Sequence, residues 1–218
     1  MNDQAPRCLL LGGGGHARVL IDGLLESGAA RPVAILDSDP AKQGTDIYGV
    51  PVLGGDDRLA EVVGQGVRHF LVGLGGVRHN QPRARLFAQG LAAGLTPLTF
   101  RHPTAFQSPR AVVGQGCQLF PLCAVNAGAS LGQNVIVNSQ ALVEHDCQLA
   151  DHVHLASGAR LCSTVRVGTG AHIGAGAVVK QLVTIGAWAV VGAGAVVLAD
   201  VPAGALVGGV PARPLGQP

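Results

Sequence analysis

Residues 131–155 read LGQNVIVNSQALVEHDCQLADHVHL, and an aliphatic residue returns at every sixth position of this stretch. The spacing continues on both sides, so that fifteen aliphatic residues keep one register from Val113 to Val197. A second register, two residues before the first, holds only Ala, Cys or Val. Neither the 3.6-residue period of a helix nor the two-residue period of a strand produces a strict six-residue repeat.

A repeating unit made of a short strand and a corner explains both registers. Residues two apart in a strand point to the same face, so each unit places one large and one small side chain inward. Such units bury their apolar faces only by stacking on their neighbours, which predicts a parallel β-helix of hexapeptide repeats. We interpret the glycines that follow the large position as corner residues with positive φ. They are Gly114, Gly132, Gly168, Gly174, Gly186 and Gly192.

The N-terminal part has a different pattern, in which buried strands alternate with helices. Residues 7–15, RCLLLGGGG, are typical of a strand that enters a glycine loop, and residues 16–27 have apolar positions at helical spacing. A second strand at 32–36 ends at Asp37. The run Gly12-x-Gly14-x-x-Ala17, followed by this acid, matches a dinucleotide fingerprint and favours a phosphate-bearing or sugar-nucleotide ligand. Alternatively, the glycines only allow tight packing of strand against helix.

The later part of this region predicts further βα units, and the whole forms a half-Rossmann α/β domain with parallel strands. We expect helices at 56–63 and 81–93, and strands at 69–74 and 95–100. The proline-marked junction RHPTAFQSPR follows, and we place the domain boundary there, with domains at 1–103 and 104–218. The final GGVPARPL is expected to cap the open end of the β-helix.

The composition excludes several classes of function. The net charge is only +2 and no basic stretch stands out, which disfavours nucleic acid as a partner. No apolar run reaches the roughly 20 residues of a membrane span, and MNDQAPR lacks the layout of a signal peptide, so we expect a cytoplasmic protein. Three of the five cysteines, Cys117, Cys123 and Cys147, occupy the small inward register. We therefore expect core packing rather than disulfides, metal ligation or a nucleophilic Cys147.

Polar residues gather in one part of the β-helix, NSQALVEHDCQLADHVH at 138–154. Its polar side chains lie outside the two inward registers, at outward or corner positions. A histidine beside carboxylates is suited to general-base chemistry near neutral pH, and EHD is the most polar triplet. His154 and His172, eighteen residues apart, are expected to stack on one outer face. A three-histidine metal site and simple solvation of His152 and His172 are the alternatives.

Several motifs in order carry a resemblance to a known family. They are LGGGGHARV at 11–19, ILDSD at 35–39, RHP at 101–103, NSQALVEHDC at 138–147 and GGVPAR at 208–213. The sequence resembles bacterial sugar acetyltransferases of the PglD/NeuD type, within the hexapeptide-repeat acyltransferase superfamily. It is most similar to enzymes that N-acetylate UDP-linked 4-amino sugars and GDP-perosamine.

The resemblance implies a left-handed β-helix, a homotrimer, and acetyl-CoA bound between neighbouring subunits, with no metal. It implies that His145 is the catalytic base, that Asp146 supports it, and that Asn138 belongs to the active site. The positions expected along CoA are His154, Gly174, Ala175, Gly192 and Ala193. The positions expected at the nucleotide sugar are Gly13, Gly14, Gly15, His16, Asp37, Ser38, Gly75 and Gly76.

The sequence departs from the family pattern after the third strand, where relatives place Gly, then Asp or Asn, then Asn. This chain has Gly75-Gly76-Val77 there, so substrate contacts from that loop are lost or replaced by backbone groups. We expect N-acetylation of a nucleotide-linked 4-amino sugar by direct attack in a ternary complex. The rival hypotheses are O-acetylation of a sialic-acid-like sugar, a metal-dependent hydratase of the γ-carbonic-anhydrase kind, and an inactive binding trimer.

Overall fold

The structure, a computed structural model, describes residues 5–76 and 79–215. It contains two compact units, of which the first comprises the chain up to Gly75 and residues 83–100. The second comprises residues 76–82 and the chain from Arg101 onward. The sequence-based division at 103/104 stays a prediction, and the segment 76–82 groups with the second unit.

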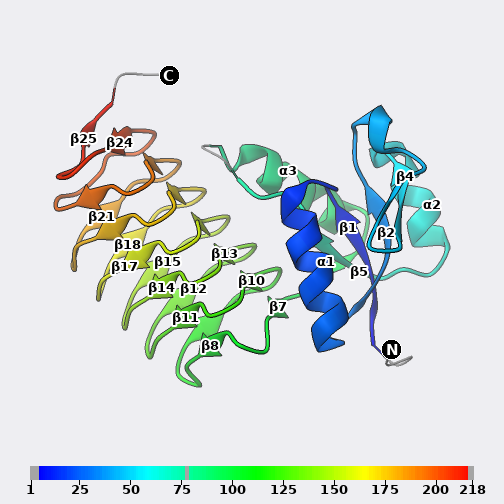
Figure 1. Ribbon diagram of the computed structural model, residues 1–218, viewed down its shortest axis with the longest axis horizontal. Coiled ribbons are helices and arrows are strands. Elements are labelled where there is room, and N and C mark those ends of the chain that lie inside the picture. The colour runs from blue at the N-terminus through cyan, green and yellow to red at the C-terminus, as the bar shows by residue number, and fades with distance from the viewer. Residues whose placement is uncertain (1–4, 77–78, 216–218) are drawn as a thin grey trace. The chain divides into compact units, whose positions relative to one another are not determined.

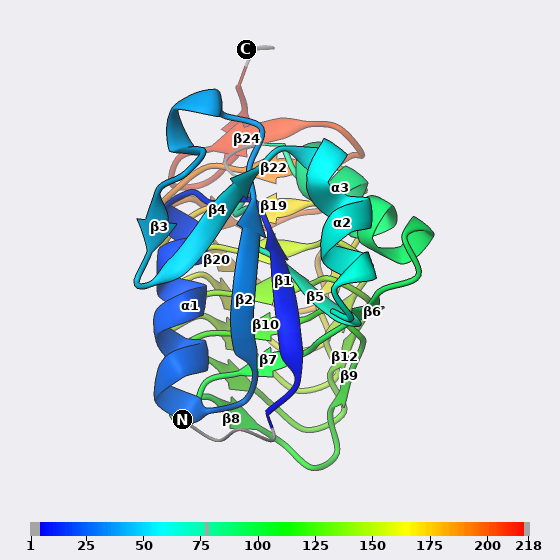
Figure 2. The same ribbon diagram turned by 90° about the vertical axis from the view of Figure 1, so that its right-hand side faces the viewer.

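The first unit is a six-stranded sheet with helices on both faces. Its strands lie in the order β3-β4-β2-β1-β5-β6, and all neighbours are parallel except β3 and β4. Figures 1 and 2 show α1 and α2 on opposite faces of this sheet. The elements are β1 (Arg7–Leu11), α1 (Gly15–Ser27), β2 (Arg31–Leu36), η1 (Pro40–Lys42), β3 (Asp46–Ile47), β4 (Val50–Gly54), η2 (Asp56–Arg58), α2 (Leu59–Gly64), β5 (His69–Val72), α3 (Gln81–Ala92) and β6 (Thr96–Pro97).

Most predicted elements of this unit are confirmed, but the strand expected at 95–100 is wrong: only Thr96–Pro97 belongs to this sheet, and Phe100 begins the first strand of the β-helix. The sequence reasoning also missed the hairpin β3–β4. Tyr48 and Gly49 form its two-residue turn with φ of 52° and 79°. Positive φ at both central positions is the geometry that suits the twist of a tight hairpin. The turn brings Val50 and Val52 to buried positions beside β2. Among the described residues, no helix has the length and apolar composition that a membrane span requires.

The second unit is a stack of triangular coils, as predicted from the period of six (Figure 1). Its strands, all of two residues except the three-residue β24, form three sheets. Their orders are β25-β24-β22-β19-β16-β13-β10-β7, β23-β20-β17-β14-β11-β8 and β21-β18-β15-β12-β9. Each strand pairs in parallel with the strand one coil away; His154 of β16 lies opposite His172 of β19, for example. The antiparallel strand β25 closes the last coil.

The strand bounds of the second unit follow the hexad, because the large inward residue ends almost every strand. They are β7 (Phe100–Arg101), β8 (Phe106–Gln107), β9 (Val112–Val113), β10 (Gln118–Leu119), β11 (Ala124–Val125), β12 (Ser130–Leu131), β13 (Ile136–Val137), β14 (Leu142–Val143), β15 (Gln148–Leu149), β16 (His154–Leu155), β17 (Arg160–Leu161), β18 (Arg166–Val167), β19 (His172–Ile173), β20 (Val178–Val179), β21 (Thr184–Ile185), β22 (Val190–Val191), β23 (Val196–Val197), β24 (Leu206–Gly208) and β25 (Arg213–Pro214).

Both inward registers form one continuous core along the β-helix, as predicted. Cys117, Cys123 and Cys147 lie inside it with at most 1% of their surface exposed. All five cysteines are free thiols. Burial raises the pKa of Cys123 to about 12. At these three positions of the small inward register, Cys therefore serves as a compact apolar residue, as the sequence pattern indicated.

The interpretation of the six hexad glycines as positive-φ residues was wrong. Positive φ instead occurs two residues later, at every corner from Gly116 to Gly194, and more than half of these residues are not glycine. Five of the six hexad glycines, all except Gly192, are required because the next coil passes too close for a side chain. A Cβ on Gly168 would lie 2.5 Å from the amide nitrogen of Ala187, and one on Gly174 the same distance from that of Ala193.

Candidate active site

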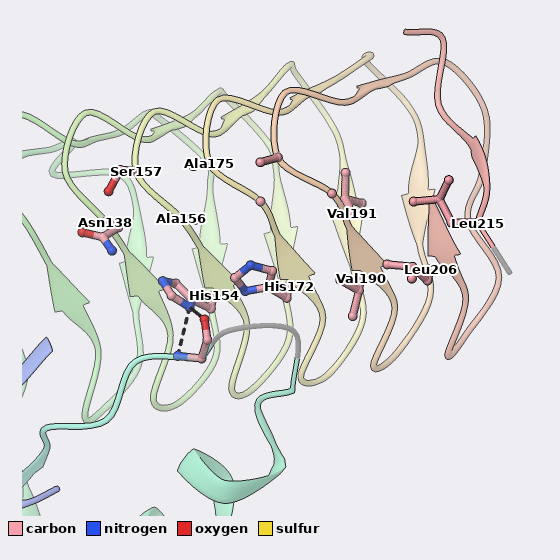
Figure 3. Close-up of a pocket in the computed structure, with 14 residues that line it drawn as sticks. Asn138, His154, Ala156, Ser157, His172, Ala175, Val190, Val191, Leu206 and Leu215 are labelled. Atoms are coloured by element: carbon pink, nitrogen blue, oxygen red, sulfur yellow. Dashed lines mark hydrogen bonds between the residues drawn. The ribbon is translucent and has the colours of Figure 1, made fainter. Parts of the chain in front are cut away.

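An elongated pocket of about 500 Å³ runs along successive coils of the second unit. Figure 3 shows Asn138, His154, His172 and Ala175 arranged along it. All five residues expected along CoA line this pocket, together with Asn138 and Gly76. The lining residues that sequence reasoning did not assign are Ala156, Ser157, His172, Val190, Val191, Leu206 and Leu215. The hexad phase could have indicated them, since they lie at or beside the ends of strands in one sheet.

His154 and His172 stack as predicted, but they are buried, whereas solvation had been an alternative for His172. They are 5% and 9% exposed, and their ring centroids lie 5.0 Å apart in an edge-to-face arrangement. Gly76 and Asn80 lie beside this pair. The Nδ1 atom of His154 lies 2.9 Å from the carbonyl oxygen of Gly76, and the side-chain amide of Asn80 donates to the carbonyl oxygen of Ala171. His154 and His172 lie on an outer face of the β-helix, yet they are buried next to residues that do not belong to the hexapeptide repeats.

His145 and Asp146 form a hydrogen-bonded pair at an exposed corner. The His145 Nδ1 atom lies 2.8 Å from a carboxylate oxygen of Asp146, and both side chains are more than half exposed. Asp146 takes the corner conformation with φ of 60°, which Asp tolerates better than most residues. Glu144 accepts hydrogen bonds from the backbone N–H of His145 at 3.2 Å and from the Asn126 amide at 3.0 Å. The carboxylate of Asp146 therefore holds Nδ1, which leaves Nε2 to accept a proton.

Within one chain, His145 does not reach the pocket of His154. Asn138 follows strand β13, and His145 follows β14, so the strand Leu142–Val143 separates the two corners. His145 is not a lining residue of the pocket. The predicted site residues of the second unit consequently form two groups on one chain, the pocket and the corner.

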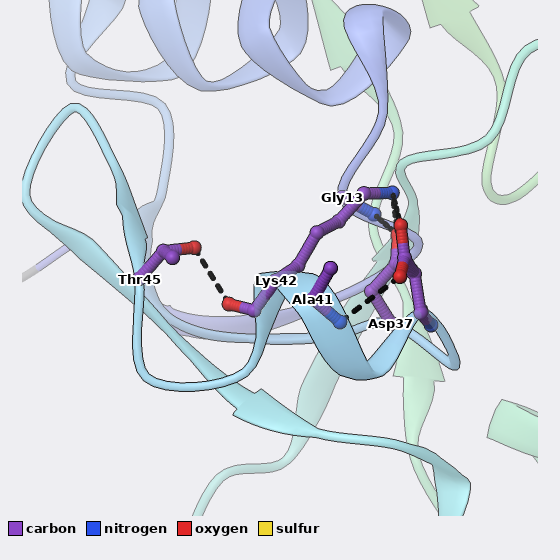
Figure 4. Close-up of polar contacts among 6 residues, drawn as sticks. Gly13, Asp37, Ala41, Lys42 and Thr45 are labelled. Carbon is purple, nitrogen blue, oxygen red and sulfur yellow. Dashed lines mark hydrogen bonds and ion pairs between the residues drawn. The ribbon is translucent and has the colours of Figure 1, made fainter.

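A second polar cluster lies in the first unit, at the end of β2. The carboxylate of Asp37 accepts hydrogen bonds from the N–H of Gly13 at 2.7 Å, from Lys42 at 2.9 Å and from the N–H of Asp39 at 3.0 Å (Figure 4). Partial burial acts to raise the pKa of Asp37, but the hydrogen bonds, first that from Lys42, outweigh it and hold the pKa below its usual value. Asp37 therefore stays ionised, with its charge balanced by Lys42.

A cleft of about 240 Å³ adjoins this cluster and is lined by Gly12, Asp37, Ser38 and Lys42, among others. The helix α1 begins at Gly15, and its cap residue Gly14 makes no side-chain cap bond. The expected substrate positions Asp37 and Ser38 thus line one cleft. Lys42, which sequence reasoning did not assign, could have been suspected from its cationic side chain five residues beyond Asp37.

Gly75 and Gly76, in the loop after β5, have different neighbours. A Cβ on Gly75 would lie 3.3 Å from the side chain of His16, within the first unit. Gly76 belongs to the second unit and lines the pocket of His154. Val77, the third residue of the departure from the family pattern, lies outside the described residues. Within the described part of the chain, no group of three or more His, Cys, Asp or Glu side chains is arranged to hold a metal ion.

Comparisons with known proteins bear on the family and the fold of the chain. Residues 7–89 match the PglD N-terminal domain family. GDP-perosamine N-acetyltransferase of Escherichia coli O157:H7 is 35% identical over 84 residues, which is 38% of this chain and 38% of the relative. A similar solved structure is that of perosamine N-acetyltransferase from Caulobacter crescentus, in complex with CoA and GDP-perosamine, in which one histidine is replaced by asparagine. It has a TM-score of 0.90 at 37% identity, over 96% of this chain and 97% of that one.

The acetyltransferase domain of PglB from Neisseria gonorrhoeae, in complex with acetyl coenzyme A, has a TM-score of 0.87 at 33% identity, over 97% of this chain and 100% of that one. The α/β unit followed by a left-handed β-helix of hexapeptide repeats therefore defines a hexapeptide-repeat acyltransferase architecture. The chain belongs to the PglD-type sugar acetyltransferases.

Proposed function

We propose that this protein is an acetyl-CoA-dependent N-acetyltransferase that acts on the amino group of a nucleotide-linked 4-amino-deoxy sugar. The observation that carries the proposal is the elongated pocket, because it brings His154, Ala175 and Ala193 together along the coils. The relatives support the two substrates, since the Caulobacter enzyme is described with CoA and GDP-perosamine and the Neisseria domain with acetyl coenzyme A.

The shape and lining of the pocket suit the extended arm of acetyl-CoA. The lining residues extend from Asn138, after β13, to Leu206 in β24, which are four strand spacings apart in the sheet. At about 4.8 Å per spacing this is a length of about 19 Å. Glycine and alanine at the corners, such as Gly174 and Ala175, leave room for an extended chain to lie against the backbone.

His145 is proposed to act as the general base. Its Nε2 takes a proton from the attacking amine while the amine nitrogen bonds to the thioester carbonyl carbon, and Asp146 stabilises the imidazolium that forms. The C–S bond then breaks, and the departing thiolate of CoA takes up a proton. Histidine variants of the Caulobacter enzyme hold both CoA and GDP-perosamine. A histidine of that enzyme is therefore dispensable for binding, which fits a role in the chemical step.

The separation of His145 from the pocket supports a homotrimer in which one subunit supplies the base and its neighbour the pocket. Several large apolar side chains on the β-helix are more than half exposed, as expected of surfaces that neighbouring subunits cover. They are Phe106, Val112, Leu122 and Leu182. A cytoplasmic location stays part of this proposal.

The nucleotide sugar is proposed to bind the first unit at the Asp37 cluster. Lys42 and the uncapped start of α1 provide positive charge for a diphosphate, while the Asp37 carboxylate can accept a hydrogen bond from a hydroxyl or an amide N–H. The glycine loop therefore contributes backbone contacts to the nucleotide sugar, next to the ion pair between Lys42 and Asp37. Gly75 lies close to the side chain of His16, the second residue of α1.

The proposal is tested by a screen of nucleotide-linked amino sugars. The protein is incubated with acetyl-CoA and GDP-perosamine, or with UDP- and dTDP-linked 4-amino sugars, and free thiol and acetylated sugar are measured together. Stoichiometric thiol release with an acetyl product that resists mild alkali is the expected result, because an amide survives conditions that cleave an ester. An alkali-labile product would indicate O-acetylation instead. Absence of acetylated product with all donors and acceptors would contradict the proposed function.

Direct attack, rather than an acyl-cysteine intermediate, is expected because Cys147 is unsuited to be a nucleophile. It is fully buried, its thiol donates to the carbonyl oxygen of Cys162 at 3.1 Å, and burial raises its pKa to about 11. Replacing Cys147 by alanine should leave kcat within about twofold of wild type and lower stability by about 1 kcal/mol. Cys123→Ala, at the same inward register, is the matched control. A loss of turnover in the Cys147 variant but not in the Cys123 variant would support an acyl-cysteine intermediate.

A further inference from the structure

We propose that Asn80 is a positioning residue for His154: it fixes the backbone of Gly76 against the His154 ring and so determines which ring nitrogen carries the proton in the pocket. The catalytic consequence of this inference rests on the proposed function, but the contacts do not. Asn80 belongs to neither the repeat pattern nor the motifs recognised in the sequence.

Asn80 is hydrogen-bonded to the β-helix. Its side chain is fully buried, and its amide donates to the carbonyl oxygen of Gly170 at 3.0 Å and to that of Ala171 at 3.2 Å. The two carbonyl groups belong to the corner that precedes β19, which carries His172. One amide group thus uses both of its N–H donors on backbone carbonyls, an arrangement that an aspartate of the same shape could not make.

The same side chain determines what can stand at position 76. A Cβ on Gly76 would overlap the Oδ1 atom of Asn80, and the His154 Nδ1 atom would lie 3.4 Å from it. Only glycine therefore fits between Asn80 and His154. The departure of this chain from the usual polar loop residue at this point has a physical reason, since Gly76 is enclosed on two sides.

Gly76 in turn orients the His154 ring. The Nδ1 atom lies 2.9 Å from the Gly76 carbonyl oxygen and 3.3 Å from its amide nitrogen. Nδ1 cannot donate to the oxygen and accept from the N–H at the same time. The shorter distance favours a protonated Nδ1 that donates to the carbonyl, which makes Nε2 the acceptor atom of the neutral ring. A small shift of Gly76 would change which of these two contacts the Nδ1 atom makes. The hydrogen bonds that hold Asn80 in place therefore control the tautomer of His154.

The experiment measures the tautomer of His154 and the affinity for CoA separately from turnover. ¹⁵N NMR of histidine-labelled protein distinguishes the two neutral tautomers, and the His154→Gln variant identifies the signal. In the wild type we expect one tautomer with the proton on Nδ1. In Asn80→Ala we expect a mixture of tautomers, with calorimetric affinity for CoA weaker by about tenfold, because the two buried hydrogen bonds that hold Asn80 are lost. His79→Ala, an exposed neighbour in the same segment, should change neither quantity.

A double-mutant cycle distinguishes positioning from a general effect on stability. Gly76→Ala alone should weaken CoA binding strongly because its Cβ overlaps Asn80, and should add little in the Asn80→Ala background, where the overlap is gone. Asn80→Asp, which keeps the shape but loses the donors, should behave like Asn80→Ala. The proposal is overturned if folded Asn80→Ala and Asn80→Asp keep the wild-type tautomer and CoA affinity, or if the two substitutions are additive. Because CoA binding and the tautomer need no sugar substrate, a failure of the proposed function would appear separately, in the acetyl-transfer assay.

Discussion

Replacing His145 by alanine is expected to lower kcat for acetyl transfer by about 10²–10⁴-fold, the usual contribution of a positioned general base. The amine of an amino sugar must lose a proton as it attacks, and His145 is the histidine whose Nδ1 is held by a carboxylate at 2.8 Å. The side chain is more than half exposed in the single chain, so its loss should not disturb the core of the β-helix. The measurement is kcat with saturating acetyl-CoA, alongside a circular dichroism spectrum that should remain unchanged.

Binding should survive in this variant, because His145 does not line the pocket of its own chain and, in the proposed trimer, contributes the base to the neighbouring pocket. We expect calorimetric affinity for CoA within about threefold of wild type, since a residue that acts mainly in the transition state contributes little to ground-state binding. Asp146→Asn is the matched control: it keeps the size of the side chain but removes the charge that supports the imidazolium, and should give a smaller loss. Retention of more than about a tenth of the wild-type kcat in His145→Ala would remove His145 as the base.

The β-helix could be predicted almost residue by residue because its period is local and strict. Each coil repeats the same two inward positions, so a register identified in one hexad holds for all of them, and the core cluster contains both registers. The first unit was harder to predict, since the hairpin β3–β4 depends on a two-residue turn at Tyr48-Gly49. A tyrosine at positive φ is not a strong turn signal in a sequence.

The residues of the candidate site that belong to the hexapeptide repeats could be predicted. Those from outside the repeats could not. The hexad phase placed His154 next to His172, the family resemblance indicated Ala175, and both His154 and Ala175 line the pocket. Asn80 lies 90 residues before Gly170 in the chain, yet their groups lie 3.0 Å apart. No periodicity relates two such positions, so sequence reasoning had no signal for Asn80 or for the burial of His172.

The hexad glycines were recognised by position but explained by the wrong physics, and the difference has a measurable consequence. If these residues served only to adopt positive φ, alanine would be unfavourable at each of them through backbone strain. The structure instead indicates a steric requirement that depends on the next coil. A Cβ on Gly168 would lie 2.5 Å from the amide nitrogen of Ala187 and 2.8 Å from its Cα. On Gly192, in the same hexad phase, the nearest atom is the Val207 carbonyl oxygen at 3.3 Å.

Gly168→Ala is therefore expected to lower the free energy of unfolding by about 1–3 kcal/mol, because overpacking against a backbone cannot be relieved by a side-chain rotation. Gly192→Ala should change it by less than about 1 kcal/mol, since a shift of a few tenths of an ångström relieves its contact. Urea unfolding followed by circular dichroism measures both at equal protein concentration. Equal losses in the two variants would contradict the steric account. Because each coil of a solenoid contacts only its neighbours, the alanine methyl at 168 should act by separating one pair of coils. Gly168 does not line the pocket of His154, which is the proposed CoA site, so affinity for CoA should be retained while the fold is intact.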